Sequence, residues 1–246
     1  MRERRRLSYL GHSTTLVELD GVRLLTDPLL RRRVLHLRRS SPVPGHETPD
    51  AVLISHGHQD HLDLPSLDRL PRELPVVVPP GLGRVVAARG FRDVREVDEG
   101  DEVSFGPVTV RATHADHSGR SLPGRTDATV GYAVLGSARV FFAGDTGLFD
   151  GMGGLVPDLD LALLPIWGWG PTIGPGHLDP RGAAEALTLL RPRLAVPIHW
   201  GTFRPFYHSS RAAFLREPAD AFLAAAQELA PGVAVHVLEP GSSIDF

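Results

Sequence analysis

Three histidines and an aspartate lie close together in this chain, as His56, His58, Asp60 and His61 in the pattern H-x-H-x-D-H. Neutral imidazole nitrogens and carboxylate oxygens are ligands that a divalent ion such as zinc accepts. The chain has 246 residues, 12 histidines and no cysteine, so a metal site would use nitrogen and oxygen donors. By chance the pattern would occur in roughly a few chains per thousand, so we interpret it as a metal-binding loop rather than a polar surface loop.

The spacing of these four residues favours two ions rather than one. The loop follows an apolar run, 51–54, that reads as a buried strand. In a loop leaving a strand, His56 and His58 can approach one ion, while Asp60 and His61 turn toward a second position. One open catalytic ion needs about three protein ligands, so four donors exceed what one ion requires.

Three further candidate ligands each follow a predicted strand. They are His117, Asp145 and His199, after the strands predicted over 108–113, 139–143 and 194–198. Loops that leave the ends of neighbouring strands converge on one crevice. Each residue alone has an ordinary structural explanation, but together the seven donors divide into two groups with a bridge. The groups are His56, His58 and His117 around one ion, and Asp60, His61 and His199 around the other, with Asp145 bridging them.

Composition favours one globular domain over 1–246. Hydrophobic residues make up 42% of the chain and charged residues 22%, with no low-complexity linker and no internal repeat. The net charge of -3 argues against a nucleic-acid-binding protein. No stretch approaches the roughly 18 apolar residues of a membrane span, and the apolar run 7–10 is too short for a signal peptide, so we expect a cytoplasmic protein.

The order of predicted elements indicates two packed sheets covered by helices. Helical periodicity appears over 82–89, 180–190 and 218–229, and a hairpin turn is expected at Asp20-Gly21. The other predicted strands cover 14–19, 22–26, 76–78, 103–105, 130–134, 161–164 and 233–238. Early hairpins followed by interposed helices favour a layered α/β sandwich over a doubly wound parallel sheet.

Six motifs distributed over nearly the whole chain resemble those of the metallo-β-lactamase-fold hydrolases. The branch is the one that includes N-acylphosphatidylethanolamine-hydrolysing phospholipase D and ascorbate-6-phosphate lactonase. The motifs are Gly11-His12-Ser13-Thr14, Thr26-Asp27-Pro28, Arg39-Ser40-Ser41-Pro42, the loop Ser55 to Asp63, Ala143-Gly144-Asp145-Thr146 and Pro197 to Phe203. The resemblance implies a four-layer αββα sandwich and two divalent metal ions, commonly zinc, with manganese or iron as alternatives.

The resemblance also suggests roles for residues outside the loop. The segment after 108–113 contains His114 and His117, of which the family pattern needs one, and we favour His117. His177 resembles a family position that can face the substrate, although it could equally be a helix-entry residue beside the N-cap candidate Asp179.

Metal-bound imidazoles usually donate their second N–H to an oxygen partner. His12, Asp27 and Asp63 are candidates for such supporting positions, and Asp63 is also a candidate N-cap with Pro65 in the first helical turn. Trp167-Gly168-Trp169 departs from the family and could either contact an apolar substrate or pack in the core. His36, His46, His208 and His236 receive no role.

The expected activity is hydrolysis at a dinuclear centre, in which a bridging hydroxide attacks a phosphorus or carbonyl centre. Asp60 would ligate a metal and orient that hydroxide, and His177 would assist at the leaving oxygen. The arginine-rich segment Leu29 to Arg39 favours a lipid-like phosphodiester substrate and peripheral membrane contact, unless it is only a solvated loop.

The alternatives are a lactone or other ester hydrolase and a non-catalytic metal-binding protein of the same fold. A diiron oxidoreductase would need a carboxylate in place of His58 and usually a flavin domain. No oligomeric state is predicted.

Overall fold

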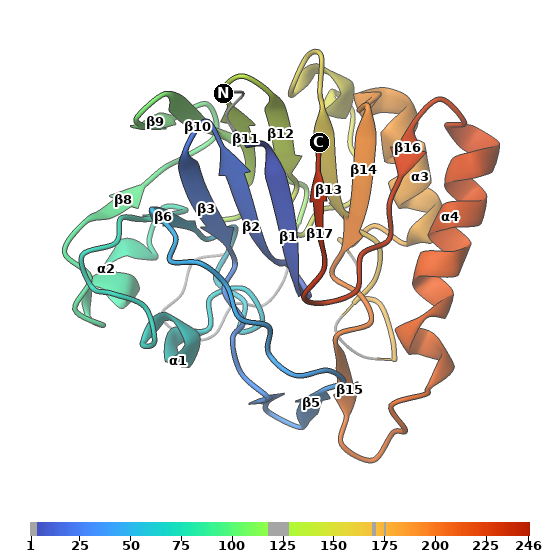
Figure 1. Ribbon diagram of the computed structural model, residues 1–246, viewed down its shortest axis with the longest axis horizontal. Coiled ribbons are helices and arrows are strands. Elements are labelled where there is room, and N and C mark those ends of the chain that lie inside the picture. The colour runs from blue at the N-terminus through green and yellow to red at the C-terminus, as the bar shows by residue number, and fades with distance from the viewer. Residues whose placement is uncertain (1–3, 118–127, 169–170, 175) are drawn as a thin grey trace.

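Two seven-stranded mixed sheets face each other (Figure 1), and the computed structural model describes residues 4–117, 128–168, 171–174 and 176–246. The first sheet has the order β17-β1-β2-β3-β6-β7-β8. Its strands are β1 (Arg6–Gly11), β2 (Thr14–Leu19), β3 (Val22–Thr26), β6 (Ala51–Leu53), β7 (Val76–Val78), β8 (Val94–Glu96) and β17 (Ser243–Asp245).

The second sheet has the order β16-β14-β13-β12-β11-β10-β9. Its strands are β9 (Glu102–Phe105), β10 (Val108–Thr113), β11 (Gly131–Leu135), β12 (Arg139–Phe142), β13 (Leu161–Pro165), β14 (Leu194–Ile198) and β16 (Ala234–Val235). Both sheets follow one plan, with three antiparallel pairings followed by three parallel ones. Parallel neighbours end at the same edge of a sheet, so the loops that leave them meet there.

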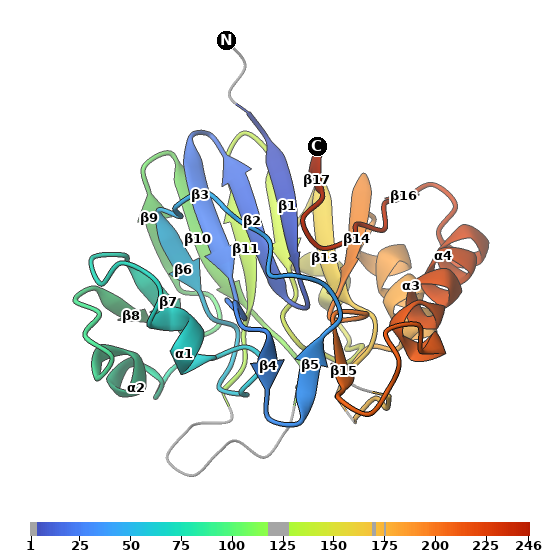
Figure 2. The ribbon, with the colours of Figure 1, turned by 60° about the horizontal axis from the view of Figure 1, so that its bottom comes forward.

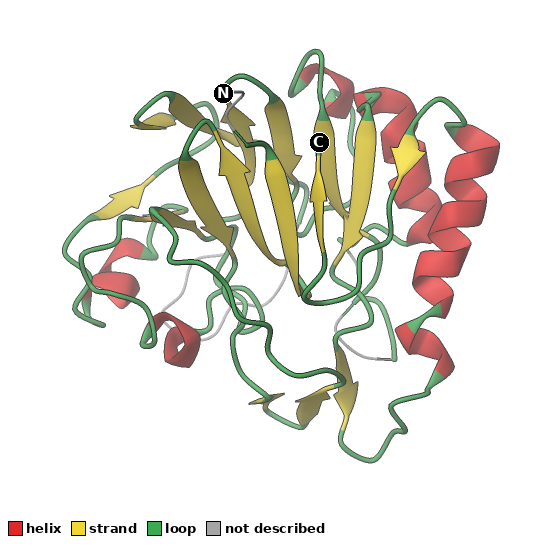
Figure 3. Ribbon diagram, in the orientation of Figure 1, coloured by secondary structure: helices red, strands yellow, loops and turns green. Residues whose placement is uncertain are grey.

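Helices cover the outer face of each sheet (Figure 3). The helices are α1 (Leu64–Leu67), α2 (Gly83–Ala87), α3 (Pro180–Leu190) and α4 (Glu217–Leu229). One apolar cluster fills the space between the sheets, a second joins the outer face of the second sheet to α3 and α4, and a third joins the first sheet to α1 and α2. The expected four-layer αββα sandwich is therefore confirmed.

Local sequence signals place the turns and helix ends. The Asp20-Gly21 turn is confirmed, because Leu19 pairs with Val22 and both turn residues have positive φ. Asp63 caps α1 by accepting a hydrogen bond from the backbone N–H of Ser66, as predicted. Asp179 caps α3 in the same way, and Pro180 lies in its first turn.

A small three-stranded sheet projects beyond the edge where these loops meet (Figure 2). It consists of β4 (Arg33–Val34), β5 (Leu37–Arg39) and β15 (Phe203–Pro205), in the order β15-β5-β4. Its inner face is apolar, because Val34, Leu37 and Phe203 pack with the buried Leu29. The segment predicted as an arginine-rich loop is thus partly a β-hairpin.

The structure corrects several of the predicted elements. Strand β1, which lies between β17 and β2 in the first sheet, was not predicted, because the chain start read as a basic segment. The strand predicted over 233–238 shortens to Ala234–Val235. The short strands β4, β5, β8, β15 and β17 were also missed, because two or three residues carry too little periodicity to be recognised.

No helix in the described part of the chain is long and apolar enough to cross a membrane.

The two sheets are joined tightly where β6 meets β11 and β12. The backbone N–H of Val130 donates to the carbonyl of Ser55 at 3.0 Å, and the hydroxyl of Tyr132 donates to the carbonyl of Ile54 at 2.7 Å. Gly144, which follows β12, has φ +62°, and a Cβ atom there would lie 2.7 Å from Cβ of Ser55. The close approach therefore requires glycine at position 144.

We expect Gly144→Ala to destabilise the protein more than Gly151→Ala. Both glycines have positive φ, but a Cβ at Gly151 would meet nothing within 4 Å. Gly151→Ala should lower the free energy of unfolding by about 1–2 kcal/mol through backbone strain alone, and Gly144→Ala by about 2–5 kcal/mol because it adds overlap with Ser55. Urea unfolding of both variants measures the difference, and equal losses would contradict this account of the contact.

Candidate metal centre

The seven predicted ligands converge at the edge of the two sheets, although they come from four separate segments. A cavity of about 370 Å³ opens above them. Its walls include His58, Asp60 and Asp145, and also His36 and His177. The structure thus brings the predicted ligands together beside a space that can admit a substrate.

The first predicted group, His56, His58 and His117, forms a cluster whose ligand atoms all lie within 4.8 Å of one another. Nε2 of His117 lies 3.2 Å from Nδ1 of His58. The carbonyl of Gly176 accepts a hydrogen bond from Nδ1 of His117 at 2.8 Å, and Oγ of Ser55 accepts one from Nδ1 of His56 at 3.0 Å. These bonds leave Nε2 of His56 and of His117 as the lone-pair nitrogens that face the cluster.

The second predicted group, Asp60, His61 and His199, is equally compact. Nε2 of His199 lies 3.1 Å from Nε2 of His61 and 3.4 Å from Oδ2 of Asp60. Nδ1 of His61 donates to Oδ2 of Asp27 at 2.7 Å, and Nδ1 of His199 donates to the carbonyl of Trp167 at 2.7 Å. Both rings therefore present Nε2 to the same point.

Asp145 lies between the two groups, as predicted for a bridging ligand. Its Oδ2 is 3.1 Å from Nε2 of His61 and 3.8 Å from Nε2 of His56, and its Oδ1 is 3.3 Å from Nε2 of His199. The same Oδ2 is 3.2 Å from Nε2 of His177. One carboxylate is thus within reach of both groups.

The spacing of the ring nitrogens fits a tetrahedral divalent ion. Two nitrogens bound to one zinc at the usual bond length are separated by about 3.3 Å, and the two pairs of rings here approach at 3.1 and 3.2 Å. Nε2 of His56 and Oδ1 of Asp145 are buried without a hydrogen-bond partner among the described residues. Buried polar atoms are normally paired, so these two atoms are suited to bind a cation.

Electrostatics in the cluster is dominated by burial and by the carboxylates. Burial lowers the pKa of His56 well below its usual value. Burial also opposes protonation of His199, but the carboxylates of Asp145 and Asp60 outweigh it and raise that pKa to about 9. For Asp145, burial raises the pKa, while His199 and His61 together hold it well below the usual carboxylate value. The carboxylates are therefore anionic and attract positive charge to this point.

The supporting residues are partly those predicted. Asp27 is fully buried and accepts hydrogen bonds from His61 and from both the N–H and the hydroxyl of Ser55. His12 instead contacts a carboxylate, because its Nε2 donates to Oδ2 of Asp60 at 3.0 Å. Among the described residues, the carboxylate of Asp63 accepts from Ser66 and from Arg31 and contacts no imidazole.

The structure places the two histidines that follow β10, His114 and His117, in different surroundings. His117 joins the first group, whereas Nδ1 of His114 donates to Oε2 of Glu99 at 2.9 Å and the His114 ring packs against Phe149. The preference for His117 thus agrees with the geometry. The sequence alone does not show which of the two histidines lies nearer to His56 and His58, because both follow the same strand.

The structure also places the remaining candidate residues, for which the sequence left two interpretations open. His177 lines the metal cavity and also precedes the α3 N-cap, so its two interpretations are compatible. Trp167 packs partly buried against the cluster beneath α3 and α4, which favours the core interpretation, and Trp169 lies outside the described residues.

His36 was given no role, yet it lines the cavity, because the pairing of β5 with β15 brings it there. No local sequence signal could have identified it.

We expect His117→Ala to lose metal and His114→Ala to keep it. Removing one of three nitrogen donors leaves the first position under-coordinated, so His117→Ala should retain about half of the metal of the unaltered protein. The measurement is metal content per chain by plasma mass spectrometry after zinc loading and gel filtration. Full metal in His117→Ala, or equal losses in both variants, would contradict the assignment.

Comparison with known proteins agrees with this geometry. A family model described as a beta-lactamase superfamily domain matches residues 22–200. A UPF0173 metal-dependent hydrolase from Methanopyrus kandleri is 32% identical over 252 residues, which cover 98% of this chain and 99% of that protein. N-acyl-phosphatidylethanolamine-hydrolyzing phospholipase D 1 from Caenorhabditis elegans is 32% identical over 243 residues, covering 87% of this chain and 67% of that protein.

Among solved structures, a metallo hydrolase from Ignicoccus hospitalis superposes with a TM-score of 0.73 at 25% identity, covering 98% of each chain. The sandwich, the buried His/Asp cluster and these relatives agree with one another. The chain therefore belongs to the metallo-β-lactamase superfamily and is a metal-dependent hydrolase of that superfamily.

Proposed function

We propose that this protein hydrolyses a lipid-like phosphodiester. We also propose that the seven ligands described above hold two divalent ions and that these ions are zinc. The observation that carries the substrate class is the surface beside the metal cavity, which combines arginines that have no carboxylate partner among the described residues with exposed apolar side chains. We also propose that this surface makes peripheral contact with membranes. Lactone or ester hydrolysis is the competing activity, and the same assays distinguish it.

The cluster supports a division of labour among its residues. Divalent ions bound there would supply Lewis acidity for attack by water. Asp60 is held in one orientation by the hydrogen bond from His12, so its carboxylate can both bind the second ion and orient the nucleophile. The carbonyl of Gly174 accepts from Nδ1 of His177, which aims Nε2 of that ring toward Asp145 and the cavity. In its imidazolium form, which carries a proton on both ring nitrogens, His177 is thus placed to donate the Nε2 proton to the leaving oxygen.

A row of three arginines crosses the outer face of the three-stranded sheet. Arg38 of β5 pairs directly with Arg33 of β4 on one side and with Arg204 of β15 on the other. Arg204 donates a hydrogen bond to the carbonyl of His208, but none of the three has a carboxylate within ion-pair distance among the described residues. Like charges directly opposite on neighbouring strands are destabilising, and an anionic headgroup bound to the row would remove that cost.

Apolar side chains stand next to this arginine row. Leu35, Phe206 and Tyr207 are 70%, 69% and 68% exposed, and they lie at the ends of the paired strands β4, β5 and β15. The backbone N–H of Phe206 donates to the carbonyl of His36, which lines the metal cavity. A phosphodiester with acyl chains would therefore find apolar and cationic surface directly at the cavity entrance.

The comparisons support the same class of substrate without deciding it. The relative from Caenorhabditis elegans is named for hydrolysis of an N-acylated phosphatidylethanolamine, a phosphodiester that carries acyl chains. The relative from Methanopyrus kandleri is named only as a metal-dependent hydrolase.

We expect the zinc-loaded protein to hydrolyse bis(p-nitrophenyl) phosphate and a glycerol phosphodiester, and to be inactive on a panel of lactones. His177→Gln should slow the glycerol ester by about 100-fold but the p-nitrophenyl ester by less than about tenfold, because only the poor leaving group needs a proton. His114→Gln is the matched control and should leave both rates unchanged. Lactone turnover without diester turnover would overturn the substrate class, and stoichiometric metal with no turnover would favour a binding protein.

We expect the arginine row to mediate binding to anionic vesicles. Each arginine near a negative surface contributes about 1 kcal/mol, so Arg33→Gln combined with Arg38→Gln should weaken binding at least about tenfold. Arg92→Gln, an exposed arginine on the far segment before β8, is the control. Co-sedimentation with phosphatidylglycerol vesicles, compared with phosphatidylcholine vesicles, gives the partition coefficients. Equal binding of all variants would show that the row is not the contact surface.

A further inference from the structure

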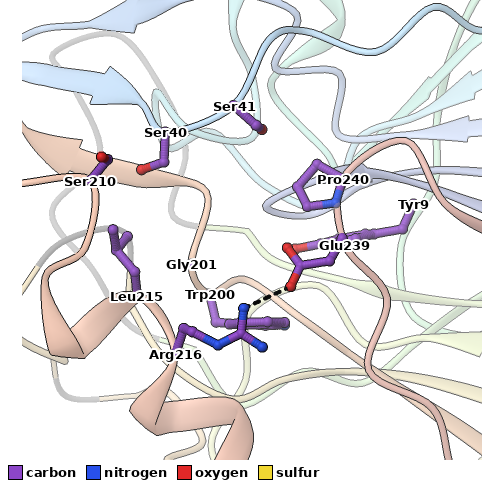
Figure 4. A pocket seen from close by; sticks show the side chains of 10 residues that line it. All are labelled: Tyr9, Ser40, Ser41, Trp200, Gly201, Ser210, Leu215, Arg216, Glu239 and Pro240. Atoms are coloured by element: carbon purple, nitrogen blue, oxygen red, sulfur yellow. Dashed lines mark hydrogen bonds and ion pairs between the residues drawn. The ribbon is translucent and has the colours of Figure 1, made fainter.

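A second cavity, of about 210 Å³, lies beside the segments that lead into the metal centre (Figure 4). Tyr9, three residues before His12, and Trp200, directly after His199, both line it. The described residues around this cavity and those around the metal cavity have no member in common. It is therefore a separate space that shares its supporting segments with the metal centre.

Three hydroxyl groups at this cavity are buried and lack a hydrogen-bond partner among the described residues. They belong to Tyr9, Ser40 and Ser41. The whole Tyr9 side chain is almost fully buried, and Figure 4 shows it entering from the wall opposite the two serines. A buried hydroxyl without a partner forfeits its bonds to water, so such groups normally face a ligand or ordered water. A cavity of this size has room for several water molecules or for one small molecule.

The charges at the cavity balance. Nη1 of Arg216 and Oε1 of Glu239 form an ion pair of 3.0 Å, which contributes one positive and one negative group. Burial raises the pKa of Tyr9 to about 12, and the nearby Thr202 hydroxyl, the Arg39 guanidinium and the backbone of His12 oppose that rise only in part, so the phenol is neutral near pH 7. A small anion would lie against Glu239 and a small cation against Arg216, whereas a neutral ligand can bond to both. Trp200 and Leu215 add apolar surface to the same walls.

We propose that this cavity binds a neutral polyhydroxy compound of the size of a monosaccharide or cyclic polyol. Its hydroxyls bond to Tyr9, Ser40 and Ser41 and to the Arg216–Glu239 pair, and its C–H surface packs on Trp200. The arrangement gives a task to Ser40 and Ser41, which the metal centre does not use. It holds whether or not the protein cleaves phosphodiesters.

Isothermal titration of the zinc-loaded protein, residues 1–246, tests this with glycerol, D-ribose, D-glucose and myo-inositol as probes. At least one should bind one-to-one with a Kd at or below about 1 mM. Tyr9→Phe and Ser41→Ala should each weaken that binding by about three- to tenfold, since each removes one hydrogen bond. Ser104→Ala, an exposed serine of β9, is the control. Inorganic phosphate and acetate are the anionic probes.

Thermal unfolding without added ligand separates binding from folding. A hydroxyl that lacks a protein partner is not needed for stability, so Tyr9→Phe should keep the Tm of the unaltered protein or raise it, while the ligand-induced rise in Tm shrinks. The proposal is overturned if none of the four probes saturates, which means that the cavity holds only water. It is also overturned if both variants bind normally, or if phosphate or acetate binds more tightly in a manner that Tyr9→Phe abolishes.

Discussion

Three buried carboxylates, those of Asp27, Asp60 and Asp145, impose the condition that the surrounding structure has to meet. A carboxylate removed from water is costly unless hydrogen-bond donors or positive charge compensate it. Asp27 meets the condition locally, through Ser55 and one imidazole of the H-x-H-x-D-H loop. Asp60 and Asp145 are surrounded mainly by imidazoles instead. An interior lined by imidazole nitrogens and carboxylate oxygens is suited to bind divalent cations, unlike an apolar core.

Backbone strain accompanies this arrangement. His12, Asp27 and His199 have φ values of 59°, 33° and 60°, in the left-handed region that residues other than glycine rarely adopt. Each directly follows a strand that ends at the metal edge. Strain of this kind persists only where surrounding contacts enforce it, and it concentrates at functional sites.

The metal centre, the arginine-bearing sheet and the second cavity are connected through two short segments. The N–H of His199 donates to the carbonyl of His12 at 2.9 Å, and the N–H of His12 donates to Oγ1 of Thr202 at 2.7 Å. The next residue, Phe203, begins β15, while Tyr9 and Trp200 on the same segments line the second cavity. The three places therefore share the backbone segments that carry His12 and His199.

The repeated plan of the two sheets explains why ligands from distant parts of the chain meet. In each sheet the parallel strands end at one edge, and the contact of Val130 and Tyr132 with the end of β6 aligns the two edges. The first sheet supplies the compact loop, and the second supplies single ligands after β10, β12 and β14. Local patterns identified most of these strands, because six-residue alternation and capping residues are readable within one element.

The sequence by itself determined the chemistry, because ligand type, the absence of cysteine and the spacing of His56, His58, Asp60 and His61 are properties of neighbouring residues. Only the tertiary structure decided between His114 and His117, placed His36 at the cavity and aligned the three arginines of β4, β5 and β15. The physical reason is that contacts between residues far apart in the chain, such as His58 with His117 and Arg38 with Arg204, are set by packing of the whole molecule, which no local window of sequence contains.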